Sequence, residues 1–254
     1  MVTVKKLYDF LNSIAPFDLI EEYDNVGLIV GDNKQIVEKA MVTLDVTTEV
    51  IAEAIKNDVN CIISHHPVLF SPVSKINEKE KIFHLIRNDI SVISAHTNLD
   101  YAIGGVNDVL AAKLSIKDIH FLSNDNTHTI GRQGEISQPM ILPDFARLIK
   151  IVLGLKSIKF TDTGRMVKKV AIIGGSGGDD IDKVLECDAD TFVTSDLKYK
   201  HFLYAKEKNL NLIDAGHYNT EILIVPVMQK WIQDYFNEIE VIISAKNIDI
   251  INYI

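Results

Sequence analysis

The sequence has little cysteine, few positive charges and no long apolar run. Only Cys61 and Cys187 occur, without C-x-x-C spacing, so we expect a reducing, cytoplasmic environment and no disulfide framework. Lysine and arginine total 26 against 35 aspartates and glutamates, which gives a formal net charge of −9. This acidic balance argues against binding to nucleic acid or to an anionic membrane, because both require a basic face.

Membrane and export signals are also missing. No apolar run reaches membrane-spanning length, and residues 1–17 are amphipathic, without the apolar core and cleavage site of a signal peptide. The 254 residues, 47% hydrophobic and 24% charged, have the composition of a globular protein with one large domain or two smaller ones.

A weak internal repeat organises the chain, and each copy reads strand, helix, strand, helix, strand. The first copy comprises 39–47, 48–59, 61–67, 79–89 and 90–100, and the second 168–178, 179–189, 190–198, 199–209 and 210–221. This alternation predicts an α/β fold: two similar β-α-β-α-β halves with mostly parallel sheets in three α/β/α layers. We expect the halves at 1–124 and 125–254, joined through the polar region near 120–130, with the strand-like run 240–254 as a candidate addition to the first half.

The repeat gathers polar side chains at strand ends. Right-handed crossovers place the carboxyl ends of parallel strands at one edge of a sheet, where ligands bind. We therefore expect an active cleft between the halves. Its residues would be His65, His66, His96 and Asp100 from the first copy, and Asp196, His217 and Glu221 from the second.

The adjacent histidines of "CIISHHPVLF" (61–70) would point to opposite faces if the strand continued. Pro67 favours a turn at this point, which would let both rings face one target. Two further pairs have i, i+4 spacing, which puts both side chains on one face of a helical turn: His96 with Asp100, and His217 with Glu221.

A single strand-end histidine is usually an ordinary polar residue, but four of the eight histidines lie in these repeat-related positions. Imidazole and carboxylate ligands without thiolate favour Zn, Mn or Fe(II). Five or six ligands exceed the need of one structural zinc, so the pattern predicts two divalent metal ions per chain, bridged by a carboxylate such as Glu221.

Four residues are candidates for substrate binding: Asn25, Gly175, Ser176 and Asp196. The glycine-rich turn "IIGGSGG" (172–178) either cradles phosphate on backbone N–H groups or is simply a tight turn, since it lacks the full pattern of a P-loop. Asn25 is either a site residue or part of a turn that feeds the strand "VGLIVG".

The motifs "EEYDNVGLIVG", "SHHP", "AHTNLD" and "DAGHYNTE", in this order, resemble the GTP cyclohydrolase 1 type 2 homolog family, also called the Ngg-one-interacting-factor-three-like family. The resemblance implies a dinuclear centre in which Glu221 bridges, His65 and Asp100 complete one metal, and His66 and His217 complete the other. His96 is then no direct ligand; it orients Asp100 or acts as a general base. The resemblance also implies a toroidal homohexamer, without the additional domain that many members carry between the halves.

Two functions follow. The first is a metal-dependent hydrolase that uses a metal-bound hydroxide on a nucleotide or a related small anionic substrate; opening of GTP with release of formate, or phosphoester hydrolysis, would use the same metals. The second is a metal-binding or regulatory ring protein without turnover. Binding to nucleic acid is a weaker third alternative, which would require lysines such as Lys198, Lys200 and Lys206 to form one stripe.

Overall fold

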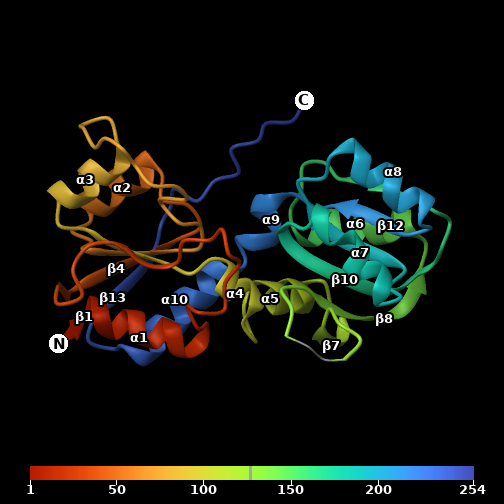
Figure 1. Cartoon of the computed structure of the whole chain (residues 1–254), viewed down its shortest axis with the longest axis horizontal. Coiled ribbons are helices and arrows are strands. Elements are labelled where there is room, and N and C mark those ends of the chain that lie inside the picture. Colours follow the sequence, from red (N-terminus) through yellow and green to blue (C-terminus); the bar gives the residue numbers. More distant parts are fainter. Residues whose placement is uncertain (126–127) are drawn as a thin grey trace. The chain divides into compact units, whose positions relative to one another are not determined.

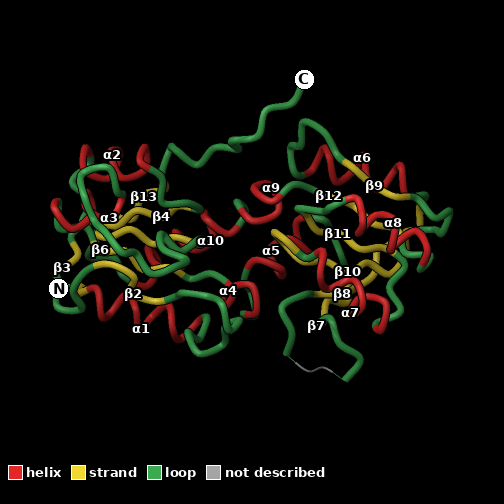
Figure 2. Tube along the Cα trace, turned by 45° about the horizontal axis from the view of Figure 1, so that its top comes forward, coloured by secondary structure: helices red, strands yellow, loops and turns green. Residues whose placement is uncertain are grey.

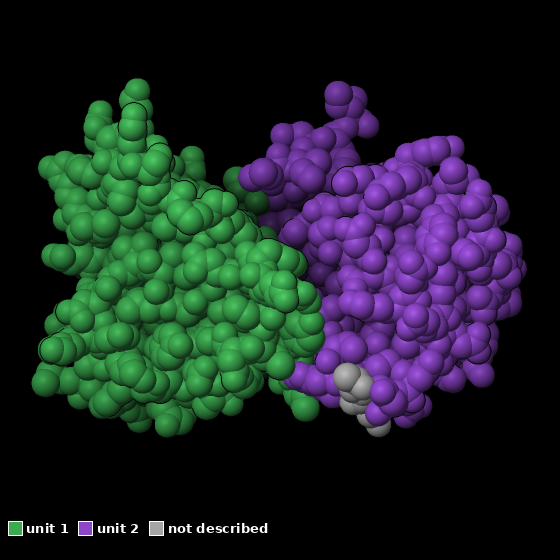
Figure 3. Space-filling view, in the orientation of Figure 1, with its two compact units in different colours: residues 1–103, 224–248 green, residues 104–223, 249–254 purple. Residues whose placement is uncertain are grey.

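The computed structural model describes residues 1–125 and 128–254. It divides them into two compact units, each with its own sheet and core (Figures 1 and 3). Unit 1 contains residues 1–103 and 224–248, and unit 2 contains residues 104–223 and 249–254.

Unit 1 is built on a five-stranded sheet of order β13-β4-β5-β6-β2. Figure 2 labels β13, β4, β6 and β2 among its strands. The strands are β2 (Gly27–Val30), β4 (Lys39–Thr43), β5 (Cys61–Ser64), β6 (Ser91–Ser94) and β13 (Glu240–Ile243), with a separate ribbon of β1 (Val2–Thr3) and β3 (Ile36–Val37). The helices are α1 (Val4–Ile14), α2 (Thr48–Lys56), α3 (Lys81–Arg87), α4 (Thr97–Tyr101) and α10 (Ile224–Tyr235). Strands β13, β4, β5 and β6 are parallel, and β2 is antiparallel to β6.

Helices cover both faces of this sheet. α2 and α3 lie on one face and α1 and α10 on the other (Figure 1). The central strands β4, β5 and β6 are buried, as expected for parallel strands covered on both sides. α2 begins where the side chain of Thr47 accepts a hydrogen bond from the backbone N–H of Val50, and its buried face packs Val50, Ile51 and Ala54 onto the core.

Unit 2 is built on a six-stranded sheet of order β7-β8-β10-β11-β12-β9. The strands are β7 (Lys117–Phe121), β8 (Arg132–Met140), β9 (Lys159–Thr161), β10 (Val167–Ser176), β11 (Thr191–Ser195) and β12 (Asn211–Asp214). The helices are α5 (Val106–Lys113), α6 (Leu142–Val152), the short 3₁₀ helix η1 (Gly178–Asp180), α7 (Ile181–Glu186), α8 (Tyr199–Glu207) and α9 (His217–Glu221). β10, β11 and β12 are parallel, and the outer strands are antiparallel.

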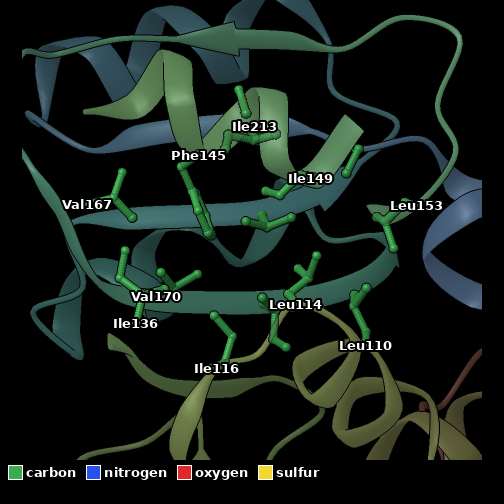
Figure 4. Packing of buried hydrophobic residues seen from close by; sticks show 14 of the residues in the cluster. Leu110, Leu114, Ile116, Ile136, Phe145, Ile149, Leu153, Val167, Val170 and Ile213 are labelled. Atoms are coloured by element: carbon green, nitrogen blue, oxygen red, sulfur yellow. The ribbon is translucent and has the colours of Figure 1, made fainter. Parts of the chain in front are cut away.

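The central strand β10 builds a core on each face because its side chains alternate. Val170 and Ile172 pack in one cluster with residues of α5 and α6, such as Leu110 and Phe145 (Figure 4). On the other face, Ala171 and Ile173 pack with α7 and α8. Each unit is therefore an α/β/α sandwich.

The predicted α/β fold with mostly parallel central strands is confirmed, and each repeat copy forms its three strands and two helices close to the expected ranges. The division of the chain differs from the one expected near 120–130, a region that includes residues 126 and 127, outside the described residues. Residues 104–124 lie in unit 2 because α5 and β7 pack on β8 and β10, and β13 pairs with β4 in unit 1. Across the described ranges, no helix has the length and apolarity to cross a membrane.

Candidate metal centre

The adjacent histidines of unit 1 leave the end of β5 through a turn. The hydroxyl of Ser64 donates to the carbonyl of His66 at 2.8 Å, while the N–H groups of His65 and His66 donate to the carbonyls of Thr43, the last residue of β4, and of Leu44. The two rings are 5.0 Å apart between centroids, with their planes 40° apart. The turn therefore keeps both imidazoles together instead of sending them to opposite faces of the sheet.

His96 and Asp100 lie at the end of the neighbouring strand β6. The backbone N–H of Asp100 donates to the carbonyl of His96 at 3.2 Å, so one helical turn separates them, as their spacing predicted. His65, His66 and His96 each offer a ring nitrogen, and these three atoms lie within 4.8 Å of one another. The Oδ1 atom of Asp100 is 3.7 Å from Nε2 of His65.

Each of these imidazoles has its Nδ1 atom fixed by an acceptor. Nδ1 of His65 meets the carbonyl of Ala95 at 2.9 Å, and Nδ1 of His66 and His96 meet the carboxylates of Asp45 and Asp24 at 2.8 Å. Since a carbonyl or carboxylate only accepts, the proton belongs on Nδ1 and the lone pair on Nε2. Metal-ligating histidines have this arrangement, in which the partner fixes both the tautomer and the ring orientation.

Of the two carboxylate partners, Asp24 is the more buried, since its side chain is not exposed to solvent. Besides His96, it accepts hydrogen bonds from the backbone N–H and the hydroxyl of Thr97. Burial alone would raise the pKa of Asp24, but the hydrogen bonds of His96 and Thr97 and the imidazole charge outweigh it and hold the pKa well below its usual range. Asp24 is therefore a permanent carboxylate behind His96.

In unit 2, His217 and Glu221 occupy the single turn of α9. Gly216, with φ of 73°, ends the extended chain and is the N-cap of this helix. Nε2 of His217 is 2.9 Å from Oε2 of Glu221, and Nδ1 of His217 is 2.8 Å from Asp196. Burial would lower the pKa of His217, but the hydrogen bonds and charges of Glu221 and Asp196 raise it to about 9.

The glycine-rich turn at the end of β10 makes room for Glu221. A Cβ atom at Gly175, whose φ is 63°, would lie 2.0 Å from Oε1 of Glu221. Its N–H donates to the hydroxyl of Thr220, and the N–H groups of Gly174 and Gly177 donate to Asn107 and Thr194. These bonds give the turn a structural role beside Glu221, and phosphate binding by Gly175 and Ser176 stays a prediction.

The remaining substrate-binding candidates also have defined places. The side-chain amide of Asn25 donates to the carbonyl of Leu69 at 2.7 Å, tying the turn before β2 to the loop after β5. Asp196 follows β11 with φ of 55° and holds the ring of His217, so in this structure it orients a candidate ligand. Ser176 ends β10 with an exposed side chain.

The donor atoms within each unit are spaced as ligands of one divalent ion would be. Two ligands bound at about 2.1 Å in tetrahedral geometry lie about 3.4 Å apart, and closer at smaller bond angles. At this bond length, the 3.7 Å between His65 and Asp100 corresponds to an angle of about 124° at the ion, and the 2.9 Å between His217 and Glu221 to about 87°. The nitrogen and oxygen donors present in unit 1 and in unit 2 therefore fit a metal ion.

Sequence reasoning missed Asp24 and Asp45, the carboxylates behind His96 and His66. Asp45 follows the first strand of the repeat and would have been found by applying the strand-end rule there as well. Asp24 lies in a turn before β2 and reaches His96 across 72 positions, so only the fold connects them.

Two α/β units whose strand ends carry imidazoles with fixed Nδ1 atoms define a candidate metal-binding protein. A family model matches residues 2–249, and the chain belongs to this family, Duf34/NIF3 (NGG1p interacting factor 3). A relative from Clostridium perfringens named "GTP cyclohydrolase 1 type 2 homolog" is 36% identical over 98% of this chain and 100% of its own length. A relative of the same name from Clostridium acetobutylicum is also 36% identical, over 97% of each chain.

Solved structures agree with the fold. The Staphylococcus aureus hypothetical protein SA1388 superposes with a TM-score of 0.91 at 32% identity and covers 99% of each chain. The reduced HcgD protein from Methanocaldococcus jannaschii has a TM-score of 0.82 at 30% identity, over 95% of this chain and 97% of its own. Both likenesses extend through both units.

Proposed function

We propose that the chain is a dinuclear metal-dependent hydrolase acting on a nucleotide or a related small anionic substrate. The observation that carries the proposal is the fixed Nδ1 of all four strand-end imidazoles: His65 on a backbone carbonyl, and His66, His96 and His217 on carboxylates. Carboxylates that fix the Nδ1 atoms of several histidines are typical of sites where the Nε2 atoms bind a metal or transfer a proton. Family membership and the shared relative name support the substrate class.

The proposed ligand set draws on both units. In this set, Glu221 would bridge two divalent ions, His65 and Asp100 would complete one, and His66 and His217 would complete the other. Zn, Mn and Fe(II) all suit these nitrogen and oxygen donors. When bound, such a pair of ions supplies Lewis acidity and lowers the pKa of a coordinated water to near neutrality. A toroidal homohexamer in the cytoplasm belongs to the same proposal.

His96 is proposed as the residue that moves a proton. Its Nδ1 is fixed on the permanent carboxylate of Asp24, so its Nε2 is the atom that accepts or donates. Asp24 also accepts a hydrogen bond from the N–H of Thr97, the first residue of α4, so it holds the turn that carries Asp100. Asn25, Gly175, Ser176 and Asp196 complete the proposal as residues at the substrate.

A turnover assay tests the proposal. The protein loaded with Mn, Zn or Fe(II) is given GTP, with formate measured, and then a small panel of nucleotides and phosphoesters. Activity that requires metal and disappears in Glu221→Ala supports the hydrolase. If the protein binds metal but no substrate in the panel turns over above the Glu221→Ala blank, the metal-binding ring protein without catalysis replaces it.

A further inference from the structure

Phe70 has an exposed phenyl ring next to the candidate metal residues of unit 1. The two residues before it are held by the core: Val68 is buried in the cluster beneath α2 and α3, and Leu69 packs against that cluster. Phe70 itself is 54% exposed. A single exposed apolar residue is ordinary on a protein surface, so its exposure points to a ligand only if its neighbours do.

The ring of Phe70 contacts the imidazole of His96. The ring centroids are 5.6 Å apart and the planes meet at 83°, so the edge of one ring faces the plane of the other. In either arrangement His96 covers at most one face of Phe70. A planar ring can stack on the other face in the offset geometry that aromatic pairs prefer, with centroids about 4.5–7 Å apart. Such a ring would lie in the immediate surroundings of His96, the residue proposed to move a proton.

The position of Phe70 is fixed by hydrogen bonds that also involve the partner of His96. The side-chain amide of Asn25 donates to the carbonyl of Leu69, directly before Phe70, at 2.7 Å. The backbone N–H of Asn25 donates at 2.7 Å to Oδ1 of Asp24, the same oxygen that lies 2.8 Å from Nδ1 of His96. One turn therefore anchors both the phenyl ring and the imidazole, which sets their relative position.

The other neighbours of His96 are candidate metal ligands. The ring centroids of His65 and His66 are 5.2 Å and 5.5 Å from that of His96. Phe70 thus places an apolar aromatic surface beside a group of polar donor atoms. Ligand sites combine apolar or aromatic surface with a few placed polar groups in this way. The arrangement suits a ligand with an anionic part for the metals and a planar part for the phenyl ring.

We propose that Phe70 is a specificity-determining residue, on which the nucleobase of the substrate stacks. The inference rests on the proposed function and deepens it, because it assigns a residue to the base of a nucleotide. An aromatic ring under a base typically contributes about 5–150-fold in affinity, largely independent of which base it is. Asn25 then acts through Phe70, as a positioning residue.

A purely supporting role of Phe70 makes a different prediction. If the phenyl ring only held the imidazole of His96 in place, its loss would disturb the site as a whole. Every ligand of the site would then bind more weakly, whether or not it carries a base. The comparison that separates the two roles is between two ligands that differ only in the base.

Calorimetry on the zinc-loaded full chain makes this comparison with guanosine 5′-monophosphate and ribose 5-phosphate. We expect Phe70→Leu to weaken the nucleotide about fivefold or more, and to leave ribose 5-phosphate within about twofold and the zinc content unchanged. Phe70→Trp, which keeps an aromatic face, should restore the affinity for the nucleotide. The matched control, Phe160→Leu, changes a 39% exposed phenylalanine of β9 in unit 2 and should affect neither ligand.

Three results would overturn the stacking. Equal losses of both ligands in Phe70→Leu would assign Phe70 a supporting role. Unchanged binding of the nucleotide in Phe70→Leu would remove Phe70 from the ligand and leave the hydrolase proposal intact. A wild type that binds the nucleotide no tighter than ribose 5-phosphate would exclude any base subsite. A selective loss in Phe70→Leu without turnover of any nucleotide would instead support the stacking while the hydrolase proposal fails.

Discussion

The two units prepare their candidate ligands differently. Unit 1 brings three imidazoles together and adds Asp100, mostly buried and held from behind by Asp24, Asp45 and a backbone carbonyl. Unit 2 offers one imidazole and one carboxylate on a single helical turn, with His217 already bonded to Glu221. Unit 1 thus supplies three imidazoles and one carboxylate, and unit 2 supplies one imidazole and one carboxylate. Neither set alone matches the five ligands proposed for two ions.

The largest expected effect comes from the carboxylate of unit 2. If Glu221 bridges two ions, Glu221→Ala should lower the metal content from about two ions per chain to near zero. Metal analysis of purified protein measures this. Glu207→Ala, at an exposed glutamate of the same unit, is the control and should keep both ions. Full retention of metal in Glu221→Ala would remove Glu221 from the site.

Replacing a proposed ligand of unit 1 should lower the metal content less than Glu221→Ala does. His66 is proposed to serve one ion only, so His66→Ala should weaken mainly that ion and leave about one per chain. The stoichiometry across a titration with Zn or Mn measures the difference from Glu221→Ala. Identical losses in the two variants would contradict the distinct roles of a bridging and a terminal ligand.

A substitution at Gly175 tests whether the room beside Glu221 matters for metal binding in unit 2. A methyl group in Gly175→Ala would overlap Oε1 of Glu221 and displace it, so metal affinity should fall about 10–100-fold, as when a supporting partner is lost. Gly154→Ala is the matched control: Gly154 has a similar φ of 66°, but nothing lies within 4 Å of its added Cβ. Competition with a chelator measures both, and equal affinities would show that backbone strain alone explains the change.

The carboxylates behind the imidazoles of unit 1 should differ in their contribution to stability. Asp24 is fully buried, so Asp24→Asn should lower the free energy of unfolding by about 1–3 kcal/mol, since it weakens charged hydrogen bonds to His96 and Thr97. Asp45 is half exposed, and Asp45→Asn should cost below about 1 kcal/mol. Urea unfolding of the metal-free variants measures both values. A larger loss in Asp45→Asn would reverse the assignment of Asp24 as the anchor.

The last prediction is a pH dependence of metal binding. The pKa of His217 is raised to about 9 without metal, so below that pH a bound metal must displace its proton. Metal affinity should therefore rise with pH, by up to about tenfold per unit for this one proton, and level off above about 9. Calorimetry in buffers of different ionisation enthalpy would detect the released proton. Affinity that is independent of pH between about 6.5 and 9 would contradict the raised pKa.

The sequence predicted the strands, the helices and the strand-end residues because the spacing of apolar residues and the positions of turn residues are local properties of the chain. It also predicted the i, i+4 geometry of His217 and Glu221, which lie at the two ends of α9. The sequence did not predict Asp24, Asn107 or Thr194, which act through contacts between distant segments. The glycine-rich turn suggested a phosphate-binding site. That the N–H of Gly175 bonds Thr220, and that Glu221 occupies the space beside Gly175, can be known only from the folded chain.

The most direct test of the central claim is the position of bound metal. Crystals grown with Zn or Mn, with diffraction recorded at the absorption edge of that metal, should show two anomalous peaks about 3.5–4 Å apart. Both peaks should contact Glu221, with His65 and Asp100 on one and His66 and His217 on the other. A single ion held only by His65, His66 and His96, or separate ions in each unit, would contradict the shared dinuclear centre.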